Sequence, residues 1–168
     1  GLTSIVYRTD LAPEYAGNHS WEILWDEKYK GRVACFDSLV DCVTIAGTMA
    51  GLKNPFDYRD QADLDATRKR MQTLVPNLLY FSNDSTSLEQ GIASGELVAA
   101  TVWNESIVRL KDQGIPVEYM QPKEGGAQTW VCGLSIVANG HFEDQAYELI
   151  DAMLEPASRA YEIREFGY

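Results

Sequence analysis

The stretch Leu97–Trp103 reads LVAATVW and is almost entirely apolar. A strand with one face in water alternates apolar and polar residues, whereas a strand covered on both faces reads as a continuous apolar run. We therefore predict that this stretch is an interior strand of a sheet whose two faces are both covered by helices.

Shorter apolar segments with the same character occur at Val33–Phe36 and Leu78–Phe81. Helical stretches separate them: one follows Ser38 and runs to about residue 50, and a second runs from about residue 60 to 75, where Pro76 stops it. This alternation predicts an α/β domain of three layers, with a mixed, mainly parallel sheet between helices.

The same patterns predict the remaining elements. Ser20 caps a short helix that reaches about Asp26, and Thr86 with Glu89 forms a capping box for another helix. Apolar residues recur with helical spacing from Phe142 to Met153, which predicts an amphipathic helix. The other predicted elements are a helix at 105–111, strands at 117–120 and 129–137, and a helix that begins at Pro156.

Length and composition are those of a single folded domain. The chain has 168 residues, of which 45% are hydrophobic and 23% are charged, so we expect one domain over residues 1–168. No apolar run approaches the roughly 18 residues that span a bilayer. Residues 1–8 lack a charged segment followed by an apolar one, so we expect neither a membrane span nor a signal peptide here.

The net charge of −11 excludes one class of partner. Nucleic-acid-binding proteins need clustered Lys and Arg to displace counterions from phosphates, so we expect no nucleic-acid partner. An acidic field attracts cations, although acidity also serves simply to keep a protein soluble.

The cysteines and histidines do not form a metal-binding pattern. Cys35, Cys42 and Cys132 show no CxxC spacing, and His19 and His141 are far apart in the sequence, so we expect no metal site. The cysteines are either buried free thiols or, in an oxidising compartment, one disulfide with one thiol left over.

No motif of a known catalytic site is present. The sequence contains no GxSxG, HExxH, P-loop or GxGxxG pattern. We therefore expect no catalytic residues, no cofactor and no enzymatic activity.

Polar and aromatic residues follow two predicted strands, where ligands gather in open α/β sheets. They are Asp37, Ser38, Asp41, Trp103, Asn104 and Glu105. Ser38 and Asp41 also match a capping box, so they are either helix caps or ligand contacts. Trp103 and Trp130 could enclose an ammonium group between their rings, or they could belong to the core.

Several motifs, in this order and spacing, resemble the spermidine/putrescine-binding periplasmic proteins of ABC importers. The motifs are SWxxLW at 20–25, YKG at 29–31, WN at 103–104, PKEGG at 122–126, LSIxAN at 134–139 and FGY at 166–168. The resemblance spans essentially the whole chain. PKEGG followed by a tryptophan is its most specific part.

The resemblance implies a periplasmic-binding-protein lobe. Members of that family have two α/β lobes that grip the ligand between them, and they are about twice as long as this chain. Leu2–Tyr7 resembles the strand that enters the second lobe, and Gly167 with Tyr168 resembles the point where the chain leaves it. The implied partners are a small amine-bearing ligand, the membrane permease of an ABC transporter and the missing first lobe, in the periplasm.

The resemblance also implies roles for individual residues. Trp103 and Trp130 match tryptophans that pack on the polyamine, and Tyr168 matches a tyrosine that contacts the ligand. Asp41 matches a glutamate that pairs with an amine.

Two positions depart from the family pattern. Ser38 and Cys132 stand where the family has aspartates, and one residue is inserted between Gly126 and Trp130. Because charge-assisted partners for a second ammonium are lost, a monoamine, an amino acid or another modified cation fits better than a long di- or trication. The function implied is a transport binding module. The alternatives are a non-transport sensor or receptor domain on the same fold, or an enzyme.

Overall fold

The computed structural model describes residues 1–167 and contains a sheet of six strands. The strands are β1 (Leu2–Arg8), β2 (Val33–Phe36), β3 (Leu78–Ser82), β4 (Ala99–Trp103), β5 (Val117–Tyr119) and β6 (Gln128–Thr129). Their order is β3-β2-β4-β1-β5, with β6 also paired to β1. β2 is parallel to β3 and β4, whereas β1 is antiparallel to β4, β5 and β6. β1 alone therefore runs against the other described strands, which confirms the mixed, mainly parallel sheet.

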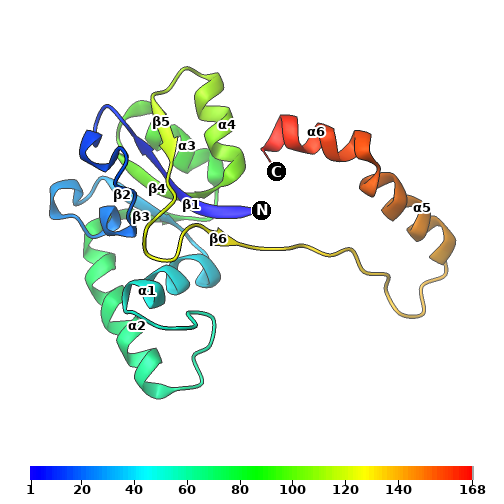
Figure 1. The fold of residues 1–168 in the computed structure, drawn as a ribbon, viewed down its shortest axis with the longest axis horizontal. Helices are drawn as coiled ribbons and strands as arrows, with labels where there is room; N and C mark the ends of the chain where they lie inside the picture. Colours follow the sequence, from blue (N-terminus) through cyan, green and yellow to red (C-terminus); the bar gives the residue numbers. More distant parts are fainter. Residues whose placement is uncertain (168) are drawn as a thin grey trace.

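Helices cover both faces of this sheet (Figure 1). The α-helices are α1 (Thr44–Met49), α2 (Gln61–Leu74), α3 (Ser85–Ser94), α4 (Asn104–Asp112), α5 (Glu143–Leu154) and α6 (Pro156–Phe166). One core cluster holds Ile45 and Leu74, from α1 and α2. The second holds Leu88 and Leu110, from α3 and α4. The predicted three-layer α/β architecture is confirmed.

Strand β4 lies in the middle of the sheet, as its composition predicts. Val98 and Ala99 belong to one core cluster, and Ala100 and Val102 belong to the other. All four side chains are fully buried. The continuous apolar run therefore follows from burial on two faces.

Short helices complete the first part of the chain. They are the 3-10 helices η1 (Pro13–Tyr15), η2 (Trp21–Leu24), η3 (Glu27–Tyr29) and η5 (Val75–Asn77), and the π-helix η4 (Leu39–Val43). Ser20 caps η2 as predicted, because its hydroxyl accepts a hydrogen bond from the Glu22 amide, but this helix ends two residues before Asp26. No helix within residues 1–167 is long and apolar enough to cross a membrane.

The predicted capping box at Thr86 and Glu89 is wrong. Asp84 caps α3, and its carboxylate accepts hydrogen bonds from the amides of Thr86 and Ser87. The Ser87 hydroxyl, followed by the Thr86 amide, lowers the pKa of Asp84. Glu89 is buried and instead binds the hydroxyl of Ser106, 2.7 Å away, so it joins α3 to α4.

The predicted strand at 129–137 is also wrong. β6 comprises only Gln128–Thr129, which pair with Thr3 and Leu2 at the very start of β1. Trp130 still exchanges backbone hydrogen bonds with Gly1, but the described segment 130–137 contains no regular strand. Its apolar side chains are exposed, and Val131 is 96% exposed.

The last two helices lie outside the body of the sheet (Figure 1). α5 is the predicted amphipathic helix and α6 begins at Pro156 as predicted, but neither contains a buried residue. Only the carboxyl end of α6 is held, because the Asn104 side chain donates to the carbonyls of Gly167 (2.7 Å) and Phe166 (3.3 Å). The core therefore comes from the part of the chain that ends at Met120.

Candidate functional site

Three aromatic rings form a group at the end of β4. The rings of Trp103 and Trp130 meet edge to face, with centroids 6.2 Å apart. Phe36, the last residue of β2, lies 4.8 Å from Trp103. Both indoles are partly exposed and Phe36 is buried. The structure thus brings together two of the predicted site residues, from β4 and from the segment after β6.

The pairing of β6 with β1 positions Trp130. Its amide donates to the carbonyl of Gly1 (3.1 Å), and its own carbonyl accepts from the amino group of Gly1 (2.9 Å). The indole also packs so closely on Gly1 that a Cβ there would lie 2.0 Å from the ring. A side chain at position 1 would therefore displace the Trp130 ring.

Ser38 is a helix cap, but Asp41 is not. The Ser38 hydroxyl accepts a hydrogen bond from the Asp41 amide (3.3 Å) at the start of η4. A reciprocal capping box would require the Asp41 carboxylate to accept from the Ser38 amide. That amide donates instead to the carbonyl of Phe36 (2.8 Å). The carboxylate of Asp41 is therefore not used for capping.

Asp41 is only 7% exposed as a whole residue. Within residues 1–167 its carboxylate accepts no hydrogen bond and forms no ion pair. The charge of Asp41 also acts on Tyr119 in β5. Burial is the main cause that raises the pKa of Tyr119, and the negative charge of Asp41 raises that pKa further. Such a group is suited to a cation that the protein itself does not supply.

Gln128 joins η4 to the segment that carries Trp130. Its side-chain amide donates to the backbone carbonyl of Asp41 (3.5 Å) and also bonds the hydroxyl of Thr44. Trp130 lies two residues further along the chain. The segments of Asp41 and Trp130 are therefore linked directly.

The other predicted site residues are not placed with this group. Cys132 is exposed on the extended segment after Trp130. Tyr168 lies outside the described residues. No cluster of three or more His, Cys, Asp or Glu side chains within residues 1–167 has the arrangement of a metal site.

The PKEGG motif holds a turn in place and does not face the rings. The Glu124 carboxylate accepts hydrogen bonds from the Ser20 hydroxyl (2.7 Å) and the Trp21 amide (3.2 Å), so it caps η2. The amide of Lys123 donates to the carbonyl of His19 (3.0 Å). This turn fixes the start of the segment that leads through β6 to Trp130.

Sequence reasoning missed several residues that shape this region. Phe36 could have been found as the aromatic residue that ends a strand beside the predicted site. Gln128 could have been found because it lies two residues before Trp130, at the start of the segment that leads to it. The bonds of Asn104 and Glu124 connect segments about 60 to 100 residues apart in the chain, so no local pattern predicts them.

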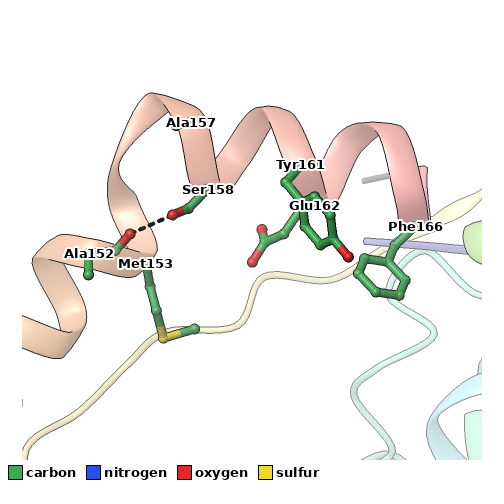
Figure 2. Close-up of a pocket in the computed structure, with 7 residues that line it drawn as sticks. All are labelled: Ala152, Met153, Ala157, Ser158, Tyr161, Glu162 and Phe166. Carbon is green, nitrogen blue, oxygen red and sulfur yellow. Dashed lines mark hydrogen bonds between the residues drawn. The ribbon is translucent and has the colours of Figure 1, made fainter.

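Two hollows lie elsewhere on the molecule. The larger, of about 590 Å³, is an open groove between α5 and α6, lined by Met153, Tyr161 and Phe166 among others (Figure 2). The smaller, of about 220 Å³, lies beside His19 and Lys123. The larger groove is mainly apolar, and its one charged side chain, Glu162, already pairs with Arg159.

Comparisons with known proteins give one consistent result. A family model described as bacterial extracellular solute-binding protein matches residues 2–168. The spermidine/putrescine-binding periplasmic protein of Escherichia coli K12 is 28% identical over 149 residues, covering 89% of this chain and 41% of that protein. The spermidine/putrescine-binding periplasmic protein 1 of Haemophilus influenzae is 29% identical over 156 residues, covering 92% and 41%.

A solved structure shows the same fold. The TpPotD lipoprotein of Treponema pallidum superposes with a TM-score of 0.83 at 20% identity, covering 100% of this chain and 52% of that chain. The chain thus spans 41% of the length of both curated relatives described above.

Proposed function

Because the chain belongs to the bacterial extracellular solute-binding protein family, we propose that it captures a small amine-bearing solute for an ABC importer. The family is one of solute-binding proteins and not of enzymes. The two relatives are named for binding spermidine and putrescine in the periplasm. We place this chain in the periplasm or outside the cell on the same grounds, and the permease of the importer is its second partner.

The Asp41 carboxylate is the observation that carries this proposal. Asp41 is 7% exposed as a whole residue, and its carboxylate has no hydrogen bond or ion pair within residues 1–167. An ammonium group beside it would supply the missing partner through a charge-assisted hydrogen bond. The partly exposed indole of Trp130 lies on the segment that Gln128 joins to that of Asp41, and the indole of Trp103 meets it edge to face. They offer the aromatic surface that a cation or its alkyl chain packs against.

The proposed ligand carries one ammonium group. Asp41 is the one carboxylate at the three positions that the family resemblance assigns to ammonium binding, because Ser38 and Cys132 replace the other two. The Ser38 hydroxyl is already engaged with the Asp41 amide, and Cys132 is exposed beyond the rings. A monoamine or an amino acid such as a γ-amino acid therefore suits this site better than spermidine.

The chain is proposed to act as the second lobe of a two-lobe protein. Its length relative to the curated relatives supports this. So does the exposed apolar face of α5 and α6, which includes Leu149, Leu154 and Ile163. We propose that the remaining polypeptide covers this face, including the groove of Figure 2.

Binding can be tested by a thermal-shift screen of the complete two-lobe protein against monoamines, amino acids, putrescine and spermidine. A ligand that binds the native state raises Tm, and calorimetric titration then gives its Kd. Mass spectrometry of the recovered ligand should show it unchanged. Failure of every amine to raise Tm would overturn the proposal, and so would chemical conversion of the ligand.

The role of Asp41 is tested by Asp41→Asn beside a remote charge control, Asp112→Asn, which changes an exposed residue at the end of α4. Asp41→Asn should weaken binding by about tenfold or more, or about 1.4 kcal/mol. The free energy of unfolding should change by less than about 1 kcal/mol, because no cap is lost. Affinity equal to that of the control would contradict the anchoring role.

A further inference from the structure

Two buried cysteines flank the loop that carries Ser38 and Asp41. Cys35 is in β2 and Cys42 is in η4, and these two elements contact each other. The side chains are 0% and 3% exposed, and both belong to the core cluster that packs under α1 and α2. The loop between them therefore begins and ends at neighbouring points of the core.

The fold places the two thiols in one buried cluster, on two elements that contact each other. A disulfide requires side chains that are already close to each other. The pKa of Cys42 is raised, with Cys35 as the first cause, burial as the second, and the charges of Cys35, Asp41 and Asp37 after them. Cys132 is exposed on the extended segment after β6 and belongs to neither element.

We propose that Cys35 and Cys42 form an intramolecular disulfide when the protein folds in an oxidising compartment. The oxidant is a disulfide, either glutathione disulfide or that of a thiol–disulfide oxidoreductase. One cysteine thiolate attacks it to give a mixed disulfide and releases one thiol of the oxidant. The second thiolate then attacks the mixed disulfide, forms the Cys35–Cys42 bond and releases the other thiol. The protein loses two electrons and two protons, and the oxidant gains them.

Burial determines when this bond forms. A buried thiol with a raised pKa is rarely a thiolate and is therefore a poor nucleophile. The bond forms during folding, while both thiols are accessible, and burial then protects it from reduction. It ties the ends of the loop together and so limits the movement of the Ser38 and Asp41 backbone. Cys132 remains the free thiol.

The sequence allows a direct test. The chain is reduced, unfolded and refolded in a buffer of reduced and oxidised glutathione, and then alkylated under denaturing conditions. Trypsin releases residues 33–53 as one peptide that contains both cysteines and no internal Lys or Arg. We expect this peptide to be unalkylated and two hydrogens lighter than the reduced form. Cleavage before Asp37 and Asp41 should give three fragments, and residues 33–36 and 41–53 should stay joined until a reductant is added.

Stability gives a second measurement. The oxidised form should unfold roughly 5–10 °C above the reduced form, because the bond constrains the unfolded chain. Reductant should not change Tm in the matched Cys35→Ser and Cys42→Ser variants. Full alkylation of the 33–53 peptide after oxidative refolding would overturn the proposal, and so would a bond from either cysteine to Cys132. The peptide result comes from the unmutated chain, so it stands even if a variant fails to fold.

Discussion

Replacing Glu124 with alanine should destabilise the protein through η2, far from the aromatic rings. The carboxylate accepts hydrogen bonds of 2.7 Å from the Ser20 hydroxyl and 3.2 Å from the Trp21 amide. A hydrogen bond to a charged group contributes about 1.5–3 kcal/mol when it is well made and buried. Because this carboxylate is only partly buried and the second bond is long, we expect about 2 kcal/mol for the pair. Tm should fall by roughly 4–8 °C.

Urea denaturation followed by circular dichroism and tryptophan fluorescence measures this loss. Glu27→Ala is the matched control, because the Glu27 side chain is 85% exposed and its nearest cation is 3.9 Å away. Glu124→Gln keeps the size and one acceptor oxygen, so it should lose about half as much stability as Glu124→Ala. The capping role would be refuted if Glu124→Ala and Glu27→Ala differed by less than about 0.5 kcal/mol.

Four further predictions concern single side chains. Thr101→Val should cost about 1–3 kcal/mol of unfolding free energy, because the buried Phe36 amide loses its 2.8 Å acceptor. Thr3→Val should be neutral or stabilising, because the Thr3 hydroxyl has no hydrogen-bond partner in the described chain. Equal losses of unfolding free energy for the two variants in urea denaturation would contradict both predictions. Asn104→Asp keeps the oxygen that accepts from the Leu2 amide of β1 but loses the nitrogen that donates to the Gly167 carbonyl after α6. Amide hydrogen exchange should therefore accelerate in α6 alone. Unchanged exchange in α6 would show that this hydrogen bond does not hold the helix. The pKa of Asp84 is lowered by folding, so its stabilisation is present above about pH 4 and lost as pH falls below that value. The Tm difference between the native chain and Asp84→Ala should narrow in acid, and a constant difference would contradict the linkage.

The sequence predicted well those strands and helices whose hydrophobic pattern follows from burial. β4 is continuous and apolar because it is covered on two faces, and α2 has an apolar stripe because one side packs on the sheet. Helix caps were predicted less well. Glu89 lies three residues after Thr86 and matches a capping box in spacing, but its carboxylate is bound by Ser106 in the next helix. Local spacing cannot reveal that competing partner.

Two other differences have the same origin. The apolar residues of 130–137 suggest a strand, but a strand requires a neighbour, and no described strand lies beside this segment beyond Trp130. The helix from Glu143 to Leu154 formed as its periodicity predicts, but none of its residues is buried against the described chain. Secondary structure was predictable in α5 because it depends on local residues, whereas its packing depends on other parts of a polypeptide.

The candidate site shows the same division. The meeting of Trp103 and Trp130 was anticipated, through their resemblance to residues in a known family. The choice between two roles for Asp41 could not be made from spacing. It depends on where the Ser38 amide donates, and that amide donates to Phe36.

Asn104 connects two segments that are at opposite ends of the sequence. Its side-chain oxygen accepts from the amide of Leu2 (2.9 Å) and its nitrogen donates to the carbonyl of Gly167 (2.7 Å). The amide group is a rigid plane, so α6 cannot slide along β1 without rotating that plane and breaking one of the two bonds. Leu2 is bonded covalently to Gly1, and Gly1 lies directly under the indole of Trp130. A displacement of α6 is therefore transmitted to the Trp130 ring at the candidate site through the Asn104 side chain and the backbone of Leu2 and Gly1.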